Sequence, residues 1–265
     1  MQDRYTGDVG DFGKYGLLKA LCQGAANAVG PALSLGVAWY LTCPEEMTAD
    51  GKHVTYLEPT PHNRAYFRNC DPPLYDGLAQ IVAGEERRVA AVRRRGILPE
   101  KTVFFEELLS FAGLPPVGAR AREVRLAHRD GWVRGALEAT RDRDVVFADP
   151  DNGLEVSSVG LQHKKGPKYA FVQELELYYR RGQSVIVYQH MDHSAPAPRQ
   201  LDARLDQLSR GLRTAGVFGL LYHRGTSRAF LVAPAGRHQG VLARRAERFL
   251  DGPWGRHFSG PYARH

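Results

Sequence analysis

Apolar positions in this 265-residue chain follow two alternating patterns from Thr102 onward. Short apolar runs typical of buried strands are separated by stretches with helical periodicity. Alternation of this kind predicts an α/β fold of the Rossmann-like type, with a mostly parallel sheet. The last two strands are joined by a short segment and predict a C-terminal antiparallel hairpin. The predicted strands are 103–106, 124–127, 145–148, 184–188, 217–222 and 229–232, and the predicted helices are 132–140, 168–181, 199–214 and 239–250.

The first hundred residues are less regular, although a length of 265 residues is compatible with one α/β domain. The pattern there predicts helices at 12–26 and 74–94 and strands at 35–42 and 54–57. The segment between the second strand and the second helix is rich in Pro, Asn and Arg. We therefore expect a single domain, 1–265, with a helical N-terminal part and a surface elaboration at about 44–100.

Composition narrows the class of protein. Three widely spaced cysteines predict neither a disulfide framework nor a zinc site, and suggest a reducing cytoplasm. The charge-free stretch 20–44 is interrupted by glycine and proline, so no membrane span is expected. The first residues, Met1-Gln2-Asp3-Arg4, lack a basic segment followed by an apolar one, so no secretory signal is expected. Lys and Arg total 36 against 29 acidic residues, and only seven of the 36 are lysine. Arginine suits phosphate and favours a nucleic-acid partner, although a GC-rich genome would also enrich it.

Glycine recurs every third residue from Gly7 to Gly16. Each glycine inside a helix costs about 1 kcal/mol relative to alanine, so this repeat predicts a close approach by a strand or ligand. Asp8, Asp11 and Lys14 follow the same period and would share one helix face. Alternatively, one aspartate is an N-cap and the lysine is solvated.

The segment Asp149-Pro150-Asp151-Asn152-Gly153 directly follows the apolar run 145–148. Ligands of open α/β sheets bind beyond the carboxyl ends of the strands, which favours a functional site here, although the same residues also make a good turn. His190 follows the next strand, where a histidine is either structural or a metal ligand. No established metal-binding spacing supports the second interpretation.

These segments resemble class I S-adenosylmethionine-dependent methyltransferases, most closely the adenine-N6 rRNA methyltransferases of the J type. That family opens with Gly-Asn-x-x-Asp-Val-x-Lys-His and has Asp-Pro-Pro-Tyr after its fourth strand, where this chain has Gly7–Tyr15 and Asp149–Asn152. The closing hairpin also matches the class I topology. Two places differ: 39–45 has no glycine, and Asn152 stands where the family has an aromatic residue.

The resemblance implies methyl transfer from S-adenosylmethionine to an amino group of a nucleic-acid base. The Asp149 carboxylate and the Pro150 carbonyl would accept hydrogen bonds from that amine, within a catalytic segment that includes Asp151 and Asn152. The cofactor would be held by Lys14, by Glu106 after the second strand and by Asp130-Gly131 after the third. The substrate would be contacted by Asp8, Asp11, Tyr15 and His190.

Two other functions are compatible with the same residues. A metal-dependent nuclease would gather Asp8, Asp11, Asp149 and Asp151 around divalent ions, with His190 as a further candidate ligand and with Asp8 or Asp11 within bridging range of Asp149. A non-catalytic nucleic-acid-binding module would keep the fold without the cofactor.

Overall fold

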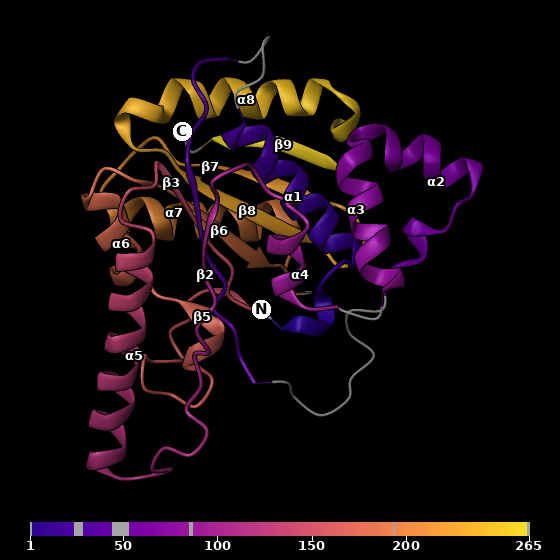
Figure 1. Cartoon of the computed structure of the whole chain (residues 1–265). Coiled ribbons are helices and arrows are strands. Elements are labelled where there is room, and N and C mark those ends of the chain that lie inside the picture. The colour runs from indigo at the N-terminus through magenta and orange to yellow at the C-terminus, as the bar shows by residue number, and fades with distance from the viewer. Residues whose placement is uncertain (1, 24–28, 44–52, 85–86, 193, 264–265) are drawn as a thin grey trace.

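A seven-stranded mixed sheet forms the centre of the computed structural model, which describes residues 2–23, 29–43, 53–84, 87–192 and 194–263 (Figure 1). Its order is β2-β1-β3-β6-β8-β7-β9. The first four strands are parallel, β8 is antiparallel to both β6 and β7, and β9 is antiparallel to β7. The strands are β1 (Leu35–Ala38), β2 (Val103–Phe105), β3 (Val145–Ala148), β6 (Ser184–His190), β7 (Phe218–Tyr222), β8 (Arg228–Ala233) and β9 (Phe258–Ala263), and a small second sheet pairs β4 (Gly153–Leu154) with β5 (Tyr169–Ala170).

Helices cover both faces of the sheet. One apolar core joins the first face to α1, α3, α4 and α8, and a second joins the other face to α5, α6 and α7. Along β3, Phe147 belongs to the first core and Val146 to the second, so an all-apolar strand is buried on both sides. The helices are α1 (Val9–Cys22), α2 (Pro61–Tyr66), α3 (Pro72–Ala83), α4 (Val89–Arg94), α5 (Ala119–Ala139), α6 (Val172–Arg180), α7 (Ala197–Leu212) and α8 (Gln239–Asp251).

The α/β class, the parallel centre and the C-terminal hairpin are confirmed. The predicted helix at 12–26 begins earlier, at Val9, and ends at Cys22, since Gln23 has an extended backbone; residues 24–28 lie outside the described residues. The predicted helix at 74–94 is instead α3 and α4, separated by a segment whose residues 85–86 are likewise not described. Within the described ranges, no helix is both long and apolar enough to cross a bilayer.

Two predicted strands are wrong. The run 124–127 lies inside the 21-residue helix α5, where its neighbours Ala, Arg and Glu favour a helix. The run 54–57 contains a short 3-10 turn at Thr55–Leu57 instead, and its buried Tyr56 packs against Phe12 of α1. The edge strand β9 was not predicted, because Gly260 and Pro261 interrupt its apolar pattern.

Candidate active site

The N-terminal segment forms a capped helix. The Asp8 side chain accepts a hydrogen bond from the Asp11 backbone N–H at 2.9 Å, which makes Asp8 the N-cap of α1. Asp11 and Lys14 follow on the same side of the helix, and both are buried. The N-cap interpretation is therefore right for Asp8, but Lys14 is not a solvated lysine.

The glycine repeat allows other side chains to lie against the α1 backbone. A Cβ atom at Gly10 would lie 2.4 Å from the Arg228 guanidinium carbon, and one at Gly13 would lie 2.5 Å from the Tyr222 ring. One at Gly16 would lie 2.3 Å from the Trp254 ring. The predicted close approach is confirmed: the hairpin β7–β8 and the segment after α8 pack on this face.

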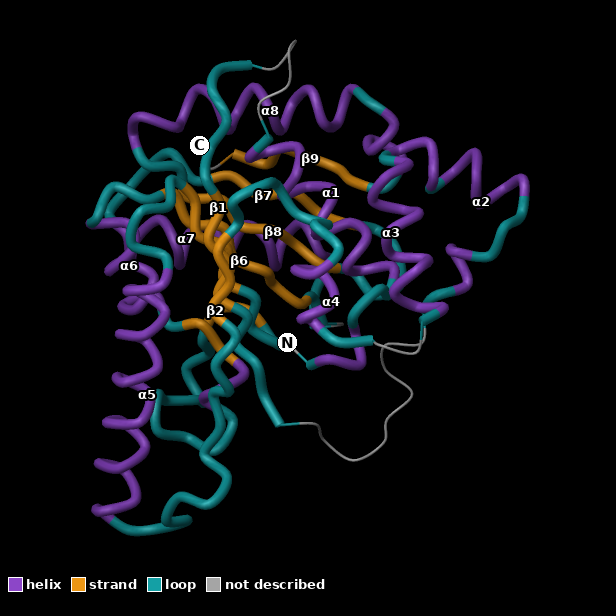
Figure 2. Tube along the Cα trace, in the orientation of Figure 1, coloured by secondary structure: helices purple, strands orange, loops and turns teal. Residues whose placement is uncertain are grey.

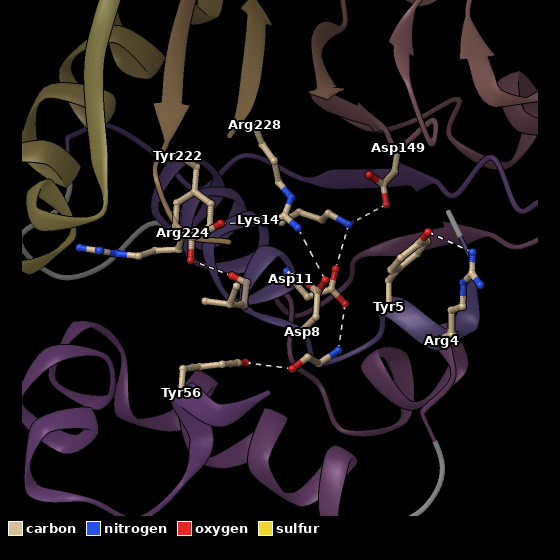
Figure 3. A network of polar contacts seen from close by, with 12 residues as sticks. Arg4, Tyr5, Asp8, Asp11, Lys14, Tyr56, Asp149, Tyr222, Arg224 and Arg228 are labelled. Atoms are coloured by element: carbon tan, nitrogen blue, oxygen red, sulfur yellow. Dashed lines mark hydrogen bonds and ion pairs between the residues drawn. The ribbon is translucent and has the colours of Figure 1, made fainter. Parts of the chain in front are cut away.

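Lys14 joins the two segments that the sequence singles out. Its Nζ donates to Asp11 Oδ1 at 2.9 Å and to Asp149 Oδ2 at 2.8 Å, the second contact spanning 135 residues of chain (Figure 3). The rings of Tyr188, Trp39 and Tyr15 surround the ammonium, with their centroids 5.6 to 5.8 Å from it. An ammonium held in this way is a fixed charge rather than a mobile surface lysine.

The electrostatics of this cluster are strongly coupled. Burial alone would lower the pKa of Lys14, but the Asp11 and Asp149 carboxylates raise it, so the ammonium stays charged. The pKa of Asp149 is raised, chiefly by burial and further by the charge of Asp11, although Lys14 opposes the shift. Burial and Asp11 also raise the pKa of Asp8, against the attraction of Arg228, whose Nη2 lies 3.6 Å from Asp8 Oδ2.

A cavity of about 410 Å³ opens beside these groups. Asp8, Asp11 and Lys14 line it from the N-cap and first turns of α1, and residues after β3 and at the carboxyl end of β6 line the other wall. The volume is within the usual range for a small-molecule site. The remaining lining residues are Gln2, Arg4, Tyr5, Gly10, His53, Asp149, Pro150, Asp151, Asn152, Lys168, Tyr188, His190, Thr226 and Arg228.

The segment after β3 is held rigidly at this cavity. Asp151 Oδ2 accepts from Thr42 Oγ1 at 3.0 Å and from Gln2 Nε2 at 3.3 Å. The carbonyl of Asn152 accepts from Gln189 Nε2 at 3.1 Å, and Gly153 has a φ of 106° that favours glycine. These bonds make the segment a turn as well as part of the cavity wall, so the two interpretations do not exclude each other.

The predicted substrate residues divide into two groups. Asp8, Asp11 and His190 line the cavity. Tyr15 does not, because it is fully buried and its hydroxyl donates to Asp11 Oδ2 at 3.0 Å. Tyr15 therefore holds the Asp11 carboxylate in position without lining the cavity itself.

The predicted cofactor residues are less closely grouped. Glu106 follows β2 as expected and lies 3.7 Å from Arg93, but it is not among the residues that line the cavity. Its Oε1 atom is buried without a hydrogen-bond partner in the described chain, as is Nε1 of Trp39 after β1. The expected place of Asp130 and Gly131 at the end of a strand is wrong: both are exposed in the middle of α5.

Several lining residues have no signal in the sequence. Arg228, Tyr188 and Tyr5 come from β8, β6 and the N-terminal turn, and only the folded chain brings them together. The glycine at position 10 indicates that some group approaches α1 closely, but it does not identify Arg228 as that group.

Metal binding receives no support from this geometry. Asp11 and Asp149 do face each other, as a nuclease would require, but the Lys14 ammonium lies between them. Among the residues described, no group of three or more His, Cys, Asp and Glu side chains is arranged to hold a metal ion.

The site combines buried carboxylates, a fixed ammonium and tyrosines around a cavity at the carboxyl ends of parallel strands. Such a site can bind a polar ligand with amino groups and orient it against Asp149 and Pro150. No protein-family model and no curated protein sequence matches this chain, so a functional conclusion has to come from the site itself.

Proposed function

We propose that this protein transfers a methyl group from S-adenosylmethionine to an amino group of a nucleic-acid base. The contact between Lys14 and Asp149 carries the proposal. It joins the two segments that resemble the adenine-N6 methyltransferases, and it does so at the wall of a cavity large enough for a small ligand. Segments that resemble one family separately and also meet in space are stronger support than either segment alone.

The arrangement of the strands also supports the proposal. The sheet ends in the antiparallel hairpin β7–β8, with β8 inserted between β6 and β7. This is the closing hairpin that the resemblance implies. The cavity lies at the carboxyl ends of β3 and β6, where open α/β sheets bind their ligands.

The residues present fit S-adenosylmethionine in two respects. Glu106 Oε1 and Trp39 Nε1, after β2 and β1, have no hydrogen-bond partner among the described residues and are an acceptor and a donor of the kind that bind ribose hydroxyls, although neither residue lines the cavity. Asp8 and Asp11 give the cavity two carboxylates that can interact with a cationic ligand, beside the Lys14 and Arg228 cations that pair with them. The cofactor, when bound, supplies a methyl group activated by a sulfonium. Contacts near β1 would differ from those of the family, because buried Trp39 and Tyr40 stand in place of a glycine-rich loop.

Asp149 and Pro150 would activate the amine. The lone pair of an exocyclic amine is delocalised into the base, so hydrogen-bond acceptors on its N–H groups increase the electron density available for attack. Both residues line the cavity, and Lys14 holds the Asp149 carboxylate in place. The raised pKa of Asp149 favours its acceptance of the proton that the amine loses after methyl transfer.

An aromatic surface for the base is available despite Asn152. Tyr5 and Tyr188 both line the cavity, Tyr5 from the N-terminal turn and Tyr188 from β6. A base taken out of its stack is usually held against such rings. These tyrosines would therefore perform the stacking that the family assigns to the aromatic residue of its fourth motif.

Cofactor binding gives the first test. S-adenosylhomocysteine should bind with micromolar affinity and raise the melting temperature of the wild type, because binding to the native state alone stabilises it. Glu106→Ala should weaken this binding, because it removes the Oε1 acceptor after β2, whereas Asp130→Ala is the control, because its exposed side chain lies in the middle of α5. No thermal shift and no heat of binding at millimolar ligand would contradict the proposal.

Methyl transfer gives the second test. Radiolabelled S-adenosylmethionine should label RNA or DNA that contains the target base, and nucleoside analysis of the product would identify the base. Incubation of the same nucleic acids with Mg²⁺ or Mn²⁺ tests the nuclease alternative. Metal-dependent cleavage without labelling would replace the methyltransferase with a nuclease.

A further inference from the structure

The helix α5 extends beyond the sheet as an arm. Its 21 residues make it about 30 Å long. Figures 1 and 2 show its N-terminal half projecting past the strands, with the segment that follows β4 beside it. We refer to residues 115–129 together with 156–168 as the arm.

The arm is fixed to the rest of the molecule. Arg129, which is 1% exposed, pairs with Glu174 of α6 at 2.5 Å. The same guanidinium donates to the carbonyls of Gly166 at 2.9 Å and Tyr169 at 2.8 Å. One turn further out, Arg125 donates to the carbonyl of Gln162 at 3.3 Å. The two parts of the arm are thus tied together at two levels, and the arm is a rigid extension.

The outer part of the arm is basic. Arg120 and Arg122 on α5, and Lys164 and Lys165 on the neighbouring segment, are all exposed. Within the described chain none of the four has an ion-pair partner. Glu123 is the single acidic residue in the arm. Arg120 and Arg122 lie two residues apart in the helix and so project from different sides of it. Four cations carried by one rigid arm produce a positive field that complements the phosphates of a nucleic acid.

The basic surface leads into the candidate active site. Lys168 lines the cavity, and its carbonyl accepts from the Asn152 N–H at 3.0 Å. Lys165 is only three residues away on the same segment. From Arg129, which binds that segment, to Arg120 the helix rises about 14 Å.

We infer that the arm binds the phosphate backbone of a nucleic acid and thereby delivers one base to the cavity. The inference rests on the proposed function for the identity of the site that receives the base. It adds the surface that recognises the strand: Arg120, Arg122, Lys164 and Lys165 contact phosphates, and the contacts are independent of sequence. Affinity therefore comes from the arm, and the choice of base comes from the cavity.

The test compares two double variants of equal net charge. Arg120→Ala/Arg122→Ala removes two cations of the arm, and Arg210→Ala/Arg244→Ala removes two exposed arginines from α7 and α8. Binding of a fluorescent 20-nucleotide single-stranded RNA is measured by anisotropy between 50 and 200 mM salt. The arm variant should bind at least tenfold more weakly, and its slope of log K against log salt should be about 1.4 smaller. The control variant should bind as the wild type does.

Equal affinities of the arm variant and the wild type would overturn the inference, and so would an equal loss in the control variant. Competition by polyglutamate as efficient as competition by unlabelled RNA would also overturn it, because the arm would then recognise negative charge in general. All these measurements omit S-adenosylmethionine. A failure of the methyltransferase proposal would appear in cofactor binding instead, and the two failures can be told apart.

Discussion

The two ends of the central strands both carry polar clusters, but the clusters differ in what they do. At the carboxyl edge, Asp8, Asp11, Lys14 and Asp149 line a cavity. At the amino edge, polar side chains next to the starts of β1, β3 and β6 belong to Ser34, Asp144, Ser184 and His238. None of these four lines that cavity.

The amino-edge cluster resembles a catalytic triad only in composition. Ser184 Oγ lies 2.9 Å from His238 Nδ1 and also accepts from the Ala235 N–H. Arg237 Nε can only donate, and it lies 3.0 Å from His238 Nε2, so Nε2 is the acceptor and Nδ1 carries the proton. His238 therefore cannot take a proton from Ser184, which is itself fully buried.

Asp144 completes the contrast. Its Oδ2 accepts from the backbone and the hydroxyl of Ser34, at 2.9 and 2.7 Å, and so ties the start of β1 to the start of β3. The amino-edge groups satisfy one another, whereas the carboxyl-edge groups also face a cavity. Residue type alone does not make a site: access for a ligand does.

The largest expected effect is on stability at the carboxyl edge. Lys14→Met should lower the free energy of unfolding by about 3 to 5 kcal/mol, because it removes the buried ammonium that Asp11 and Asp149 share. Lys19→Met, in the same helix, is the control. Its partner Asp71 is more exposed, so the loss there should be about 1 kcal/mol. Urea denaturation measures both, and equal losses would mean that the two lysines are equivalent.

The second prediction separates activity from stability. Asp149→Asn should reduce methyl transfer at least 100-fold, because it removes the charge of an acceptor whose interaction strengthens as the amine attacks. Asp144→Asn at the amino edge should leave the transfer rate unchanged and lower the free energy of unfolding by about 1 kcal/mol. Single-turnover rates and melting temperatures of both variants provide the measurement. An Asp149→Asn protein with the wild-type rate would exclude Asp149 as a catalytic residue.

A third, smaller effect tests the close packing that builds the carboxyl edge. Gly13→Ala should lower the free energy of unfolding by about 1 to 3 kcal/mol, because the Tyr222 ring lies in the way and its hydroxyl is bonded to the Val9 carbonyl at 2.7 Å. Gly131→Ala, in the middle of α5, meets no atom within 4 Å. That variant should gain about 0.5 to 1 kcal/mol from helix propensity. Stabilisation of both variants would refute the packing role of Gly13.

The smallest expected effect is a pH dependence of opposite sign at the two edges. Burial, with help from Arg237, lowers the pKa of His238, so the amino edge should lose stability as the pH falls below about 6.5. The pKa of Asp149 is raised, so its protonation favours the folded state and should add stability as the pH falls toward its ordinary range. Unfolding curves between pH 7.5 and 4.5 measure this. His238→Gln should reduce the loss of unfolding free energy as the pH falls, and Asp149→Asn should increase that loss.

Much of the fold could be predicted from the sequence, because a strand that is buried on both faces of a parallel sheet is recognisable as a continuous apolar run. The apolar run of β3, the hairpin β7–β8 and the helix α8 were all predictable from neighbouring residues. The run 124–127 was misleading for the same reason: four residues do not distinguish a strand from part of a helix. In the folded chain this run lies within α5, where Arg125 and Arg129 bind partners on other segments.

The candidate site, like the fold, could be predicted from the sequence only in part. The glycine repeat and the acidic segment after β3 identified both halves of the site, because unusual residues in regular elements need a local cause. Only the tertiary structure decided that Lys14 pairs with Asp149, that Arg228 lies over Gly10 and that Asp130 lies outside the site. The physical reason is that backbone propensity and burial act over a few residues, whereas ion pairs and cavities depend on which distant elements the sheet topology places side by side.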